Sequence, residues 1–123
     1  MRAPDSPTRP DPASFLPLSE VAWEILLALS GEARHGYAIL LEVERRTGGR
    51  PQLLPGSLYR ALHRMREQGL LEEGEPGDAA DARRRVFRLT ELGRSTARAE
   101  ARRLAEAAGA AGAAGLLARE DTR

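Results

Sequence analysis

The chain has 123 residues and no cysteine, with 41% hydrophobic and 30% charged residues. This length and composition indicate one globular domain with a modest core. The lack of cysteine excludes disulfide bonds, thiolate zinc sites and thiol nucleophiles. The N-terminus has no apolar leader segment, and no stretch approaches about 18 apolar residues. We therefore expect a cytoplasmic protein that is neither secreted nor bound to a membrane.

Charge is unevenly distributed along the chain. The net charge is only +1, and all 19 basic residues are arginine. Residues 50–103 carry a net charge of +4, whereas the segments before and after them carry −2 and −1. This asymmetry predicts one local basic surface rather than a general polycation.

The first 49 residues predict an arm and two helices. Residues 1–17 contain five of the eight prolines, which favours a disordered or loosely draped arm. Residues 19–30 predict a helix with Ser19 as N-cap, in which Trp23 lies off the main apolar stripe. Residues 35–48 predict a second helix, in which His35 is a cap-like residue and Gly36 permits close approach of another helix.

The stretch 55–71 predicts a short helix with two contrasting faces. Ser57 is a plausible N-cap, and Gly69 is a natural residue to end the helix. The apolar stripe consists of Leu58, Ala61, Leu62 and Met65. The other face carries groups that can contact base edges and phosphates in a DNA major groove, with Arg66 beside them: Ser57, Tyr59, Arg60, His63 and Arg64. On its own, such a helix is more often a solvated surface helix.

After this helix, the residue pattern changes to one typical of a β-hairpin. Residues 70–73 and 83–90 predict two strands around a polar, turn-rich tip, with Phe87 and Leu89 facing the core. Arg84, Arg85 and Arg88 lie beside the tip. An arginine run on an exposed strand is usually a solvated face. The helices expected at 35–48 and 55–71, with the turn between them, form the helix-turn-helix pattern. Behind such a pattern, an arginine-bearing strand is more often a wing that would meet the phosphate backbone or the minor groove.

Residues 91–108 predict a last helix with Thr90 as N-cap, followed by a Gly-Ala repeat that ends or frays it. Apolar residues near a 3.5-residue spacing predict a seam between two copies of the chain: Ala97, Ala101, Leu104 and Ala108. The expected organisation is an arm at 1–17, a winged helix-turn-helix domain at 18–90, a dimerisation helix at 91–115 and a flexible tail at 116–123. The fold class is mainly α with a small β-hairpin.

Together, these segments resemble the PadR family of bacterial transcriptional regulators. The resemblance rests on His35-Gly36-Tyr37, on the stretch from Pro55 to Met65, on Gly69-Leu70-Leu71 and on the stretch from Arg84 to Gly93. It covers roughly residues 18–95 and is closest to the short class with a single C-terminal helix. The resemblance implies a winged helix-turn-helix, a homodimer joined by the C-terminal helix, and repression at a palindromic operator on double-stranded DNA. The proline-rich arm is not part of the pattern.

Two other functions compete with this interpretation. A winged-helix protein–protein interaction module would have the same fold without DNA binding, although the clustered arginines argue against it. A regulator released by a small-molecule effector could hold that ligand at the dimer interface near Trp23. Catalysis is not expected, because the chain has no phosphate-binding loop, dinucleotide-binding glycine pattern, metalloprotease motif or nucleophile elbow. We also expect no cofactor and no metal, since neither histidine has a carboxylate at ligand spacing.

Overall fold

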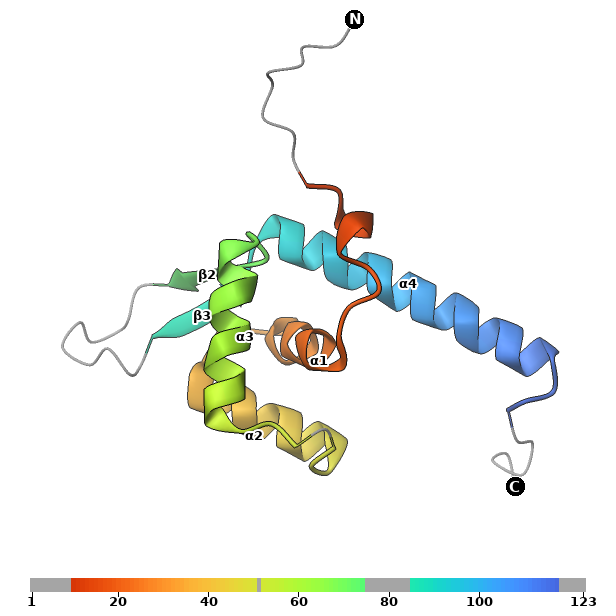
Figure 1. Ribbon diagram of the computed structural model, residues 1–123, viewed down its shortest axis with the longest axis horizontal. Helices are drawn as coiled ribbons and strands as arrows, with labels where there is room; N and C mark the ends of the chain where they lie inside the picture. The colour runs from red at the N-terminus through yellow and green to blue at the C-terminus, as the bar shows by residue number, and fades with distance from the viewer. Residues whose placement is uncertain (1–9, 51, 75–84, 118–123) are drawn as a thin grey trace, which may run out of the picture.

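The computed structural model describes residues 10–50, 52–74 and 85–117 (Figure 1). It is mainly helical with a small antiparallel sheet, which confirms the expected fold class. In chain order the elements are the 3-10 helix η1 (Pro12–Phe15), α1 (Glu20–Leu29), β1 (Arg34–His35), α2 (Gly36–Thr47), α3 (Pro55–Glu67), β2 (Leu71–Gly74), β3 (Val86–Leu89) and α4 (Glu91–Ala113).

The core lies where α1, α2 and α3 meet the sheet. The most completely buried side chains come from all three helices and include Ile25, Leu26, Ile39, Leu58 and Leu62. Burying these branched aliphatic groups is the main favourable term in folding. The expected apolar stripe of α3 is therefore confirmed, and this helix is fixed by its inner face.

The sheet has three strands, in the order β1-β3-β2. β2 pairs antiparallel with β3, with Leu71 opposite Leu89 and Glu73 opposite Phe87. Phe87 and Leu89 are buried, as the period-2 pattern predicts. β1 was not predicted, because two residues next to a helix carry no readable alternation. It pairs with β3 through Arg34 and His35, and so ties the start of α2 to the sheet.

Three of the predicted helix caps are confirmed. The side chains of Ser19, His35 and Thr90 accept hydrogen bonds from the first-turn backbone of α1, α2 and α4. The prediction for Ser57 is wrong, because α3 begins at Pro55 and has no side-chain cap. Proline is favoured in the first helical turn, where its missing N–H costs no hydrogen bond. Ser57 therefore lies inside the first turn of α3.

The arm is ordered where the structure describes it, so the prediction of disorder is wrong for residues 10–17. Asp11 caps η1, and η1 packs against α4. The backbone N–H of Leu18 donates to Oε2 of Glu100, 3.2 Å away, and Glu100 is only 2% exposed. Proline-rich sequence tolerates such a short 3-10 turn, because Pro12 occupies its first position. Residues 1–9 lie outside the described part of the chain.

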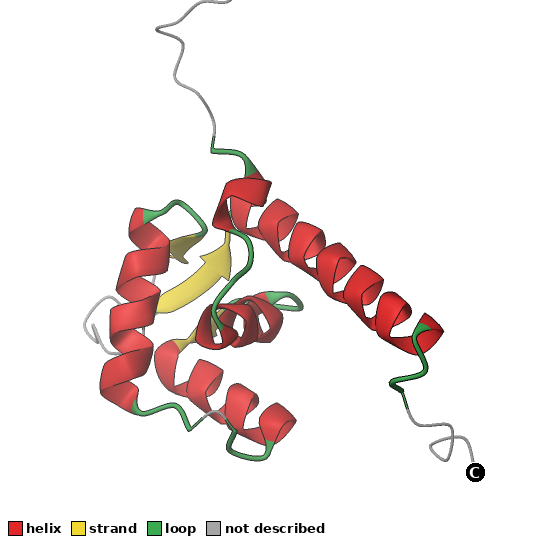
Figure 2. Cartoon of the chain, turned by 45° about the vertical axis from the view of Figure 1, so that its right-hand side comes forward, coloured by secondary structure: helices red, strands yellow, loops and turns green. Residues whose placement is uncertain are grey.

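α4 consists of a packed half and a projecting half. Its first half buries Gly93, Thr96 and Glu100, and a Cβ at Gly93 would lie 2.1 Å from the carbonyl oxygen of Leu70. Beyond Glu100 almost every residue is exposed, and the helix extends away from the other elements (Figure 2). The helix continues through Gly109 to Ala113, so the Gly-Ala repeat does not end it at 108, and it stops just short of the expected bound of 115. No helix in the described ranges is long and apolar enough to cross a membrane.

We expect Gly93→Ala to destabilise the fold by about 1–3 kcal/mol, because the added methyl group would overlap backbone that cannot easily move. Gly109→Ala is the matched control, since a Cβ there meets no atom within 4 Å. Removing a glycine from a helix interior should leave stability equal or higher by up to roughly 1 kcal/mol. Urea unfolding followed by circular dichroism measures the stability change caused by each substitution. Equal effects of the two substitutions would contradict this packing.

The anchoring of the arm by Glu100 predicts a pH dependence. Hydrogen bonds from Arg103 and from the Leu18 backbone, opposed by burial, hold the pKa of the Glu100 carboxyl below its ordinary value of 4.5. A depressed pKa adds stability that is present above pH 4.5 and is lost as pH falls through the folded-state pKa. We expect Glu100→Gln to lower stability at pH 7 by roughly 1–2 kcal/mol, with a smaller difference from wild type at acidic pH.

Urea unfolding at pH 7 and at about pH 3 measures this difference. Glu106→Gln is the control, since Glu106 is exposed on the same helix. A constant difference between Glu100→Gln and wild type across this range would show that the carboxylate does not contribute through its charge.

Candidate nucleic-acid interface

The outer face of α3 exposes the polar residues that its sequence pattern assigns to it. Tyr59, Arg60, His63 and Arg64 are exposed, and Ser57 is half-buried. They lie opposite the buried stripe, so their backbone positions are fixed by the core while their side chains face outward. Among the described residues no salt bridge to Arg60 or Arg64 is found, whereas the neighbouring Arg66 contacts Glu67 and Glu73.

The wing arginines differ, because acids of the neighbouring strand hold them. Nε of Arg88 lies 2.9 Å from Oε2 of Glu72, directly across the strand pair. Nη1 of Arg85 lies 3.3 Å from Oε2 of Glu73. Both arginines are exposed, as expected of wing residues. Arg84, which belongs to the same prediction, lies outside the described residues.

Tyr59 connects α3 to the start of α2. A Cβ built on Gly36 would lie 2.4 Å from the Tyr59 hydroxyl oxygen, so the ring occupies the space of that missing side chain. The predicted role of Gly36 in close helix approach is confirmed. The contact also holds the Tyr59 ring toward α2, although the residue is still 47% exposed.

A cleft of about 600 Å³ opens between α3, the start of α2 and the wing. Tyr37 and Tyr59 line it, and Leu62 and Phe87 form its apolar part. Its polar lining comes from His63, Arg66, Glu73 and Arg85. The structure thus brings Tyr59, His63 and Arg85 of the expected DNA-binding set to one cleft, whereas Arg60 and Arg64 are not among its lining residues.

Arg66 and Glu73 are residues that the sequence did not assign to the site. Nη1 of Arg66 lies 3.2 Å from Oε2 of Glu73, the same oxygen that Arg85 contacts. Arg66 was placed on the polar face of the helix, but nothing in its spacing indicated a partner on a strand. Tertiary packing of α3 against β2 creates this contact, and a sequence read one element at a time cannot show it.

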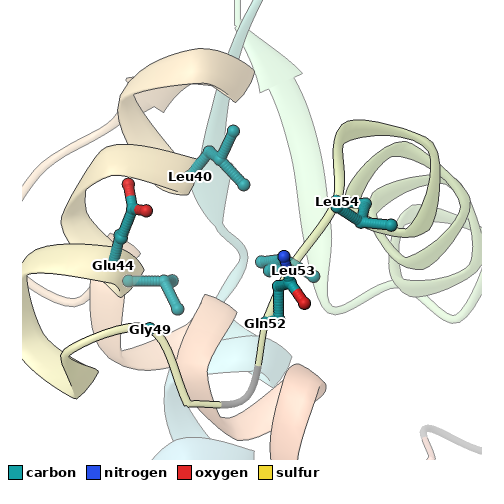
Figure 3. A pocket seen from close by; sticks show the side chains of 7 residues that line it. Leu40, Glu44, Gly49, Gln52, Leu53 and Leu54 are labelled. Carbon is teal, nitrogen blue, oxygen red and sulfur yellow. The ribbon is translucent and has the colours of Figure 1, made fainter.

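A smaller cavity lies between the C-terminal part of α2 and the loop before α3 (Figure 3). Its volume of about 150 Å³ is below that of ordinary ligand pockets, and its lining includes Leu40, Leu53 and Leu54. Trp23 is half-buried on α1 and lines neither this cavity nor the cleft beside α3. Its role in effector binding is still a prediction.

Several solved protein structures share the fold of this chain. RosR from H. salinarum shares 28% identity with the chain at a TM-score of 0.61, covering 83% of this chain and 99% of RosR. A PadR family transcription regulator from Clostridium difficile shares the fold, with a TM-score of 0.66 at 20% identity over 76% of this chain and 96% of its own. ZitR from Lactococcus lactis has a TM-score of 0.60 at 18% identity, covering 85% and 66%. No curated protein sequence matches the chain.

The family comparison covers more than half of the chain. Residues 25–99 match the model of the transcriptional regulator PadR-like family, from the middle of α1 to the middle of α4. This range contains α3, the wing and the cleft between them. The chain therefore belongs to the PadR-like family of transcriptional regulators, and its function is regulation rather than catalysis.

Proposed function

We propose that the protein is a sequence-specific repressor that binds an inverted-repeat operator in double-stranded DNA as a homodimer. The observation that carries this proposal is the outer face of α3, where Arg60 and Arg64 are exposed above a fully buried apolar stripe. A rigid helix with exposed guanidinium groups suits base reading, since arginine can form two hydrogen bonds with guanine in the major groove.

The other residues around α3 provide contacts that fix the position of the protein on the duplex. Ser57, Tyr59 and His63 can donate to phosphates or base edges beside the two arginines. Arg85 and Arg88 of the wing, with Arg84 next to them in sequence, are suited to the phosphate backbone. If a dimer neutralises about six to eight phosphates, its affinity should fall on the order of a thousandfold between low and moderate salt.

The projecting half of α4 supports dimerisation. An isolated helix is marginally stable in water, and Gly109 and Gly112 weaken it further. A second copy packed along Ala101, Leu104 and Ala108, which are exposed, would stabilise it. Ala97 is half-buried against the core of its own chain, so it can contribute less to that seam.

Two-fold pairing would place two α3 helices in successive major grooves, roughly 34–36 Å apart, so that a palindromic operator matches the dimer. Occupying such a site represses transcription when the operator overlaps the promoter. A small-molecule effector that acts near Trp23 at the dimer interface belongs to the same proposal. The protein would work in the cytoplasm, in contact with the DNA.

We expect Arg64→Ala to relax sequence preference, with a loss of roughly 1–3 kcal/mol on operator DNA and a smaller loss on random duplex. Arg85→Ala should weaken binding to both DNAs equally and reduce the salt slope by about one. Gel-shift titrations on both duplexes at several salt concentrations measure this difference. If both variants bind the operator like wild type, the assignment of α3 and the wing to DNA is wrong.

Truncation after Arg103 should give a folded monomer, because it removes only the projecting half of α4 and the tail. Loss of the paired contact should lower operator affinity on the order of a hundredfold. Truncation after Leu117 is the control and should stay dimeric. Light scattering and operator titration test both proteins. A dimer that survives truncation after Arg103 would place the interface elsewhere.

The alternative is a winged-helix module that binds another protein, and the acids that neutralise the wing arginines are the observation in its favour. Wild-type protein that binds no duplex DNA at low salt, operator or random, would favour this module over the repressor.

A further inference from the structure

The Glu73 carboxylate lies between two arginines from different elements. Its Oε2 atom is 3.2 Å from Nη1 of Arg66 on α3 and 3.3 Å from Nη1 of Arg85, which precedes β3. A single carboxylate oxygen is thus shared by two guanidinium groups in a cleft that opens to solvent. Oε2 of Glu67 also lies 3.9 Å from Nη2 of Arg66, so two arginines and two acids meet here and their formal charges cancel.

The same arrangement would hold a phosphate. Guanidinium groups bind carboxylate and phosphate oxygens with similar geometry, so a carboxylate can occupy a phosphate position. The cleft of about 600 Å³ has room for a phosphodiester beside Glu73. Tyr37, Tyr59 and His63 also line the cleft, and their side chains can donate further hydrogen bonds to an anion.

The position of the cleft indicates where such a phosphate would come from. Tyr59, His63 and Arg85 line the cleft and also belong to the surface that we assign to DNA. A duplex lying along α3 brings its sugar–phosphate backbone past the wing. Its backbone would therefore pass the mouth of the cleft.

The carboxylate can be displaced, because its contacts are partly exposed to solvent. The side chains of Glu73, Arg66 and Arg85 are 25%, 35% and 53% exposed, and ion pairs at such positions are weak. Displacement still has a cost, since the carboxylate must lose both arginines before a phosphate gains them. The free protein therefore binds DNA less tightly than the same surface would without Glu73.

We propose that the cleft between α3 and the wing is a binding site for a backbone phosphodiester, and that Glu73 occupies this site in the DNA-free protein as an internal competitor. This inference rests on the proposed DNA-binding function and adds Arg66 and Glu73 to it. Arg66 and Arg85 hold the phosphate when DNA is bound, and Glu73 sets how tightly they do so.

The test compares Glu73→Gln with wild type on a fluorescent random-sequence duplex, by anisotropy between 50 and 200 mM NaCl. We expect Glu73→Gln to bind roughly 3–10-fold more tightly at low salt, because the same phosphate contact then forms without displacing a carboxylate. Glu106→Gln is the matched control, since it removes the same charge from an exposed position on α4. It should bind like wild type. Circular dichroism checks that each variant is folded.

A second variant ties the effect to the proposed residues. Adding Arg66→Gln to Glu73→Gln should abolish the gain, and Arg66→Gln alone should bind no more tightly than wild type. A gain that persists in the double variant would overturn the assignment, as would unchanged or weaker binding by Glu73→Gln. Wild-type protein that fails to bind any duplex would instead refute the proposed function itself.

The source of the phosphate is resolved by competition with inorganic phosphate at ionic strength matched with chloride. For a site shaped by the DNA backbone, we expect phosphate and chloride to displace the duplex equally at the same ionic strength. If phosphate displaces the duplex from Glu73→Gln more strongly than chloride does, but not from wild type, free phosphate also fills the site. If phosphate displaces the duplex more strongly than chloride from wild type and Glu73→Gln alike, Glu73 is not the competing group.

Discussion

Burial of one face of α3 is the constraint on which the rest of the structure depends. Leu58, Ala61, Leu62 and Met65 are almost completely buried, and each contacts a core that α1, α2 and the sheet complete. A helix held in this way cannot roll about its axis without exposing aliphatic groups to water. The direction of every outward side chain on α3, including Arg60 and Arg64, is therefore set by the packing on its opposite side.

The sequence predicts well the features that depend on local periodicity and on single residues. The stripe of α3, the inward Phe87 and Leu89, and the caps at Ser19 and Thr90 all follow from rules that act within a few positions. Ser57 is the instructive exception. Pro55 and Ser57 are both residues that favour a helix start. Pro55 determines where α3 begins, because its φ angle is already helical.

The contacts that the sequence did not predict join different elements of the fold. The strand at Arg34–His35 exists only because β3 lies beside it, and η1 is ordered because α4 offers it a surface. Glu100 lies 82 positions from Leu18, and no pattern along the chain relates them. In the cleft, Glu73 shows the same limit, since an acid on a strand has no visible relation to an arginine on the preceding helix until both are folded.

The contact of Gly93 with the Leu70 carbonyl also bears on the geometry of an assembled dimer. β2 and β3 separate α3 from α4 along the chain, but the first turn of α4 packs directly on the turn that follows α3. If two copies join through α4, the angle between their α3 helices is then fixed by rigid packing at each end. Each base pair inserted between two half-sites rotates one of them by roughly 34–36° about the duplex axis. A dimer this stiff would meet such a change only by twisting the DNA, so spacing itself would become part of what the protein recognises.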